Sequence, residues 1–169
     1  MPEARDQILE IAVTVCEWLF AEYGVPVTHV AERQKSAGTM LYCGVLGFSG
    51  DQMRGAAVLA ASRSTLDDSN PVKGGAARDW IAELVNQLVG RLKLRLLTRK
   101  VEIYLATPVV LRGEQLSLEA RGPVAPMWFQ RPGGDTLALW LDLDLSKGFA
   151  LAEATLEESE PEQGSMMLL

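Results

Sequence analysis

The segment 76–98 constrains the fold of this chain more than any other, because it predicts one long helix with a single apolar side. At about 100° per residue, its large apolar residues fall on one half of the helical circumference. These residues are Trp80, Ile81, Leu84, Val85, Leu88, Val89, Leu92 and Leu96. The opposite side carries a straight stripe of Asp79, Glu83, Asn86 and Gly90. Such a helix needs a wide apolar surface to pack against, and it leaves the stripe facing away from the core.

The rest of the chain predicts that this surface is a β-sheet. Residues 39–48 and 53–61 flank a glycine-containing turn and are rich in apolar residues, which is typical of a hairpin. Strict alternation over 136–145 predicts a half-buried antiparallel strand. Shorter strand signals occur at 27–32 and 101–105, and residues 115–120 and 124–130 are typical of further strands or extended loops. A further helix over 4–23, ended by Gly24, has a wide apolar arc. We therefore predict an α+β fold in which an antiparallel or mixed sheet packs with two long helices.

The remaining segments are polar or carry weak signals. Residues 62–75 predict a loop with room for one helical turn. Residues 149–156 are typical of either one weak helix or an added strand, and 157–164 have the composition of a disordered segment. The apolar end, 166–169, is interpreted either as a frayed terminus or as the tip of a docking peptide. We divide the chain into a domain over 1–147 and an acidic tail over 148–169.

Charge and composition exclude several classes of protein. The formal net charge is −6, of which residues 146–169 hold −4 (five Glu, one Lys) and residues 1–145 the remaining −2. No nucleic-acid partner is expected, because the basic residues at 91–100 are explained by the end of a helix dipole. No membrane span or basic leader is predicted. Cys16 and Cys43 lie in apolar segments, which favours buried, reduced thiols and a cytoplasmic location.

The shortage of reactive side chains limits the chemistry that this chain can perform. Its one histidine is His29, so neither a Ser-His-Asp nor a Cys-His site can be built without it. The two cysteines and this histidine make no metal-binding pattern. We expect no metal and no cofactor to be bound by the chain itself. Any reaction that it catalyses must need very few groups.

The spacing of the polar stripe carries a resemblance to a known family. Asp79-x3-Glu83-x2-Asn86 on an exposed helix face, followed by Pro108 about one strand later, resembles the signature of the chemotaxis phosphatases CheX and CheC. The helix text 82–90 (AELVNQLVG) and the hairpin text 46–51 (LGFSGD) are also similar to that family. The resemblance extends over roughly residues 5–147 and is dense only at these two places.

This resemblance implies a reaction on a partner protein. Members of the family dephosphorylate the aspartyl phosphate of a CheY-like response regulator, whose receiver domain is expected to hold the magnesium ion and a lysine. The resemblance assigns to Asn86 the positioning of a water molecule, and an amide suits this role because it donates and accepts hydrogen bonds without ionising. It assigns to Glu83 an ion pair with the lysine of the receiver. The scarcity of reactive groups in the chain agrees with this chemistry.

The other residues of the signature are expected to flank the site. Asp79 either adds charge to the stripe or favours the helix start through the dipole. Gly90 and Gln87 lie beside the pair, and Gly90 either lets a partner approach or serves a packing contact. Pro108 stands about one residue closer than usual, and the connection 62–75 looks shorter than the helix-containing one expected in CheX.

The resemblance also bears on the oligomeric state, and two functions other than the phosphatase stay open. A single site on a chain of this size resembles CheX, which implies a homodimer, whereas CheC-like proteins carry two sites. An adaptor that docks on a receiver or on a flagellar switch component without catalysis is the alternative function. In a third reading the stripe is an ordinary solvated helix face and the tail is the only interaction device.

Overall fold

The computed structural model describes residues 3–33, 40–113 and 124–155, and in these segments it contains three helices and seven strands. The helices are α1 (Ala4–Glu22), α2 (Arg63–Ser69) and α3 (Ala77–Leu97). The strands are β1 (Thr28–Val30), β2 (Met40–Ser49), β3 (Met53–Ser62), β4 (Tyr104–Leu105), β5 (Val109–Arg112), β6 (Met127–Gln130) and β7 (Thr136–Leu145).

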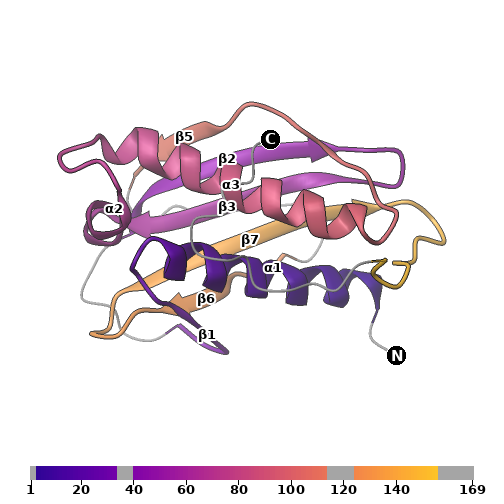
Figure 1. The fold of residues 1–169 in the computed structure, drawn as a ribbon, viewed down its shortest axis with the longest axis horizontal. Coiled ribbons are helices and arrows are strands. Elements are labelled where there is room, and N and C mark those ends of the chain that lie inside the picture. The colour runs from indigo at the N-terminus through magenta and orange to yellow at the C-terminus, as the bar shows by residue number, and fades with distance from the viewer. Residues whose placement is uncertain (1–2, 34–39, 114–123, 156–169) are drawn as a thin grey trace.

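The strands form one sheet in the order β1-β6-β7-β3-β2-β4, and β5 also pairs with β2. Every pair is antiparallel, so of the two sheet types predicted the antiparallel one is present. The helices α1 and α3 run across the same face of the sheet in opposite directions (Figure 1). The fold is thus a two-layer α+β arrangement, with the core between the helix pair and the sheet.

The alternating strands and the apolar arc of α3 meet in this core. All eight large apolar residues predicted for the core side of α3 are buried. From the sheet, every second residue of β7 points toward the helices, namely Leu137, Leu139, Leu141 and Leu143. The helix α1 contributes seven buried residues, including Phe20 near its end. Gly24 then takes a positive φ of 75°, and the Val25 amide donates to the Phe20 carbonyl, which closes the helix.

The α3 helix packs very closely on β2. A Cβ atom placed on Gly44 would lie 2.9 Å from the backbone oxygen of Ile81 and 2.9 Å from Cγ1 of Val85. Real Cβ atoms rarely come this close to their neighbours, so only glycine lets β2 and α3 approach to this separation. The packing fixes the height of α3 above the sheet and thereby the position of its exposed side.

Several sequence-based predictions need correction. The connection 62–75 contains α2, a helix of seven residues, because Ser62 caps it by accepting from the Thr65 amide at 3.1 Å. The strand predicted over 101–105 shrinks to Tyr104–Leu105, and β5 was not predicted. The strand signal at 115–120 lies outside the described residues.

The first part of the predicted tail lies against the domain. Residues 149–155 form neither the helix nor the strand that their composition allowed. Instead, Phe149 and Leu151 pack against the core, and the Thr155 amide donates to the Thr98 carbonyl at 2.9 Å. The boundary at residue 147 stays a prediction.

The close approach at Gly44 can be tested by adding one methyl group. We expect Gly44→Ala to lower the free energy of unfolding by about 1–3 kcal/mol, because α3 must shift to admit the new Cβ. Gly47 in the same strand is the matched control, since a Cβ there would meet its nearest atom at 3.8 Å. Urea unfolding of both variants measures the difference. Equal destabilisation of the two would contradict a special contact at Gly44.

Candidate functional site

The polar stripe lies on the first half of α3. Asp79 and Glu83 are exposed, and Asn86 and Gln87 are half-buried. Glu83 and Asn86 are three residues apart, which brings both side chains to one side of the helix. Gly90 is buried, so the prediction that it belongs to the exposed face was wrong. The alternative reading of Gly90, as a packing position inside this protein, agrees with its burial.

The carboxylate of Glu83 is held by a chain of hydrogen bonds that begins at Tyr23, the residue directly after α1. The Tyr23 hydroxyl donates to Oε1 of Gln87 at 2.9 Å, and Nε2 of Gln87 donates to Oε1 of Glu83 at 2.9 Å. The tyrosine contact fixes which end of the Gln87 amide faces the carboxylate, because the amide oxygen is already used. Two helices therefore determine the orientation of one exposed carboxylate.

Tyr23, where these hydrogen bonds begin, is itself held in place by aromatic packing. The ring of Tyr23 meets Trp80 edge to face at a centroid distance of 4.8 Å. The indole nitrogen of Trp80 donates to the Ser69 hydroxyl on α2 at 2.9 Å. Five residues past Asn86, Arg91 donates to the Glu22 carboxylate at the end of α1. These contacts tie the ends of α1 and α2 to α3.

Asn86 differs from Glu83 in its surroundings. Its side chain makes no hydrogen bond with any residue in the described segments, which leaves both the oxygen and the nitrogen of the amide available. Asp79 accepts from Nε of Arg78 at 3.2 Å, but with 70% and 73% of these side chains exposed the pair contributes little to stability. Pro108 is half-buried and immediately precedes β5, a strand that contacts α3.

The cysteines do not supply a nucleophile. Cys16 is completely buried and Cys43 is 5% exposed, and burial raises the pKa of both thiols. Since the thiolate is the reactive form, neither group is activated at neutral pH. Within residues 3–33, 40–113 and 124–155 there is also no group of three or more His, Cys, Asp or Glu that could hold a metal ion. What the stripe offers is one oriented carboxylate and one free amide.

Sequence reasoning missed the residues that support the stripe. Tyr23 was assigned to the apolar arc of the first helix, and Trp80 to the core side of the second. Trp80 is buried and Tyr23 is half-buried, and both pack at the core, but these assignments omit the polar atom that each ring carries. Gln87 was placed beside the site without a role. Only the antiparallel packing of α1 on α3 reveals the link among these residues.

Comparison with known proteins supports this fold independently. No protein-family model matches the chain, and no curated protein is detectably similar to it. Among solved structures, the chemotaxis protein CheX from Vibrio vulnificus matches with a TM-score of 0.68 at 18% identity, over 85% of this chain and 100% of that one. Thermotoga maritima FliY matches with a TM-score of 0.53 at 13% identity, over 86% of this chain and 91% of FliY.

A third match is to CheX from Borrelia burgdorferi, solved as a CheX–CheY–BeF3–Mg²⁺ complex. Its TM-score is 0.59 at 13% identity, over 83% of this chain and 97% of that one. The chain has the CheX fold. This finding confirms the fold that the resemblance to CheX and CheC implied. None of the helices in the described part of this CheX-like chain is long and apolar enough to cross a membrane.

The hydrogen-bond chain from α1 can be tested without removing the aromatic contact. We expect Tyr23→Phe to lower the free energy of unfolding by about 0.5–1.5 kcal/mol, because the ring still packs on Trp80 while Gln87 loses its donor. The side-chain amide signals of Gln87 in an NMR spectrum should move as well. Tyr104→Phe is the control, since Tyr104 is 60% exposed. Unchanged Gln87 signals in Tyr23→Phe would show that the chain of bonds does not form.

Proposed function

We propose that this protein dephosphorylates the aspartyl phosphate of a CheY-like receiver domain in chemotaxis or two-component signalling. The observation that carries the proposal is the Glu83-x2-Asn86 pair on one side of α3 in a CheX fold. Glu83 is exposed, Asn86 is half-buried, and the carboxylate is oriented by Gln87 and Tyr23. The fold is shared with a CheX that was solved together with CheY. The same proposal places the protein in the cytoplasm, where buried reduced cysteines persist.

The proposed reaction needs positioning more than it needs reactive groups. A water molecule attacks the phosphorus atom, the bond from phosphorus to the aspartyl oxygen breaks, and the products are inorganic phosphate and the free aspartate. Asn86 would hold the attacking water in line with the leaving oxygen, accepting a hydrogen bond through its amide oxygen. The magnesium ion that neutralises the phosphoryl oxygens is expected on the receiver.

Glu83 would act on the docking geometry. Its carboxylate would pair with the lysine of the receiver, a charge-assisted contact that also fixes the register of the two surfaces. The bond from Gln87 leaves one of the two carboxylate oxygens uncommitted within the described residues. Asp79, one turn earlier and exposed, would add negative charge along the same approach.

A non-catalytic adaptor is the alternative function, and it differs in what it requires of Asn86. An adaptor needs a complementary surface and no in-line water. The amide of Asn86 favours the enzyme, because it has no hydrogen-bond partner among the described residues and is therefore available for a water molecule.

The central test is removal of the amide. We expect Asn86→Ala to reduce the acceleration of receiver dephosphorylation by about 100-fold or more, because a displaced water loses in-line alignment. Binding to the receiver should persist. The measurement is phosphate release from a magnesium-loaded, phosphorylated CheY-like receiver, together with binding by calorimetry. Gln7→Ala, another half-buried amide on a long helix, is the control.

The outcomes of this test separate the two functions. Loss of rate with retained binding supports the enzyme. Binding without any acceleration by the wild-type chain would favour the adaptor. Wild-type rates in Asn86→Ala would rule out the mechanism proposed for the amide.

We also propose that the protein forms a homodimer through the sheet face opposite the helices. On this face Val109 and Leu111 of β5 are 58% and 49% exposed, and they pair with Val45 and Cys43 of β2. These residues adjoin a second apolar cluster that includes Val58, Ala60 and Trp140. Exposed β-branched and leucine side chains on a strand favour association with another sheet.

The dimer can be tested by placing charge on this strand. We expect Leu111→Asp to weaken self-association at least about tenfold, because a carboxylate would be buried in an apolar interface. Val72→Asp is the control, since Val72 is 64% exposed in the connection between α2 and α3. Sedimentation velocity over a range of concentrations gives the dissociation constants. A monomeric wild-type chain, or equal weakening by both variants, would contradict this interface.

A further inference from the structure

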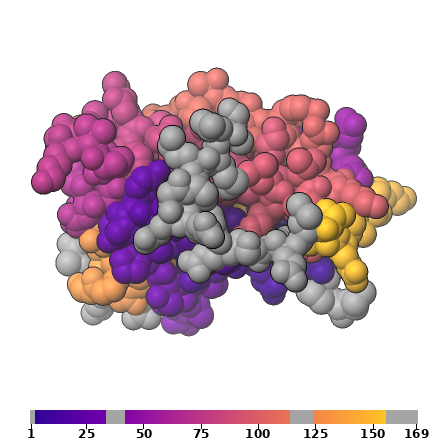
Figure 2. Space-filling view, in the orientation of Figure 1, coloured from indigo at the N-terminus to yellow at the C-terminus, as the bar shows by residue number. Residues whose placement is uncertain are grey.

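We propose that a cavity at the start of α3 binds a small organic phosphate of nucleotide size. This binding does not depend on the proposed reaction with a receiver domain. The cavity has a volume of about 350 Å³ and is bounded by α2, α3, β2 and β5. Its lining residues are Tyr42, Arg63, Ala76, Ala77, Arg78, Val110 and Arg112. In the space-filling view, α2 and the start of α3 form the magenta end of the molecule (Figure 2).

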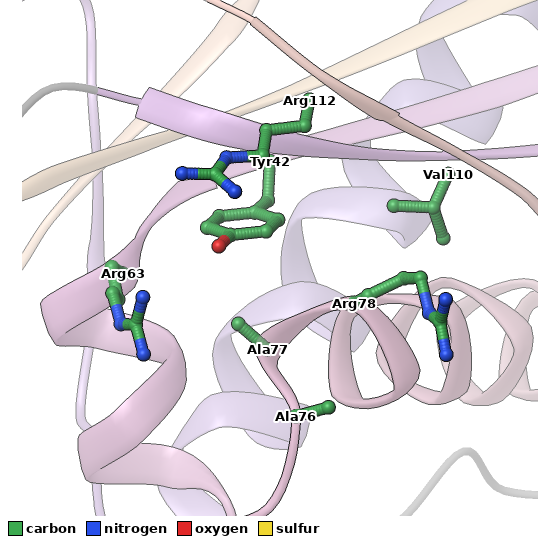
Figure 3. A pocket seen from close by; sticks show the side chains of 7 residues that line it. All are labelled: Tyr42, Arg63, Ala76, Ala77, Arg78, Val110 and Arg112. Atoms are coloured by element: carbon green, nitrogen blue, oxygen red, sulfur yellow. The ribbon is translucent and has the colours of Figure 1, made fainter.

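Three arginines from three different elements surround this cavity. Figure 3 shows the guanidinium groups of Arg63 and Arg112 on one side, near the hydroxyl of Tyr42, and Arg78 on the other side beside Val110. Guanidinium groups carry a permanent charge and offer paired N–H donors that match the oxygens of phosphate. None of the seven lining residues is acidic. The cavity therefore concentrates positive charge and hydrogen-bond donors where a polyanion would sit.

The internal partners of these arginines are weak. Arg63 lies 3.7 Å from Asp67, beyond ordinary hydrogen-bond distance, and its side chain is 65% exposed. Arg78 contacts Asp79, but both side chains are largely exposed. Arg112 stacks over the Tyr42 ring at 5.6 Å. Exposed pairs of this kind are worth little, so an incoming phosphate can compete for the guanidinium groups at small cost.

The apolar part of the lining points to an organic ligand in place of a bare ion. Ala76, Ala77 and Val110 present methyl groups, and Tyr42 presents a ring and a hydroxyl. The cavity could hold about a dozen water molecules at the volume that each takes in the liquid. A phosphate alone would leave most of this space as water against apolar surface, whereas a nucleoside group attached to it would fill the space.

The negative net charge of the protein means that a phosphate must be bound through the arginines at the cavity. The chain carries a net charge of −6, so it repels anions at long range. Binding of a phosphate must then come from local contacts in the cavity, and it should be sensitive to single arginines. Non-specific ionic binding would instead be governed by the net charge, which is unfavourable for an anion.

Calorimetric titration of the full chain with adenosine monophosphate tests the proposal. Inorganic phosphate and adenosine are titrated separately at the same ionic strength. We expect saturable binding of the nucleotide with a dissociation constant on the order of 0.1 mM, weaker binding of phosphate and no detectable binding of adenosine. Raising the salt from about 50 to 200 mM should weaken the nucleotide binding, because the contacts are partly exposed.

Matched arginine variants identify the cavity as the site. We expect Arg63→Gln and Arg112→Gln each to weaken nucleotide binding by about 3- to 10-fold, since each removes one charge-assisted contact. Arg54→Gln is the control, because Arg54 also pairs with an aspartate, is 73% exposed, and lies at the other end of the β2–β3 hairpin. Circular dichroism establishes that all three variants are folded.

Each alternative outcome overturns the proposal. No saturable binding of nucleotide or phosphate would remove the site. Equal weakening by Arg54→Gln would show a diffuse electrostatic effect. Binding of an acidic peptide but of no small phosphate would identify the basic cavity as a protein-docking surface.

Discussion

The contact between α3 and β2 is the constraint on which the rest of the structure depends. At Gly44 the strand backbone meets the backbone oxygen of Ile81 without a side chain between them. This contact sets the distance of α3 from the sheet, and the apolar arc of α3 sets its rotation about its own axis. With both fixed, the direction in which Glu83 and Asn86 point is determined by residues on the far side of the helix.

The circumference of α3 is shared among three kinds of contact. One side is buried against the sheet, a second faces the end of α1 through Gln87 and Arg91, and a third carries the exposed Asp79 and Glu83. The second side matters because a carboxylate on an exposed helix ordinarily samples several rotamers. The bond from Gln87 reduces this freedom in the protein by itself, which would lower the entropic cost of the docking that we propose.

The sequence predicted the segments with a long periodic pattern of apolar residues. It missed the features that arise only when distant segments pack together. The arc of α3 and the alternation of β7 extend over many residues, so their periods are unambiguous. The strand β5 is four residues long and its pairing with β2 decides that it is a strand, so no local signal was sufficient. Val109-Val110-Leu111 after Pro108 was the signal available, but it was too short to distinguish from a loop. The stripe was predicted from spacing, yet the burial of Gly90 and the bond from Tyr23 arise only from tertiary packing.

The first turns of α3 bring together two surfaces of opposite charge. Arg78 borders the basic cavity, and Asp79, the next residue, begins the acidic stripe. Neighbouring residues on a helix point about 100° apart, so these two charges serve different directions even though they contact each other. Because the Arg78–Asp79 pair is exposed and contributes little, the basic cavity and the acidic stripe stay independent although they adjoin at the start of one helix.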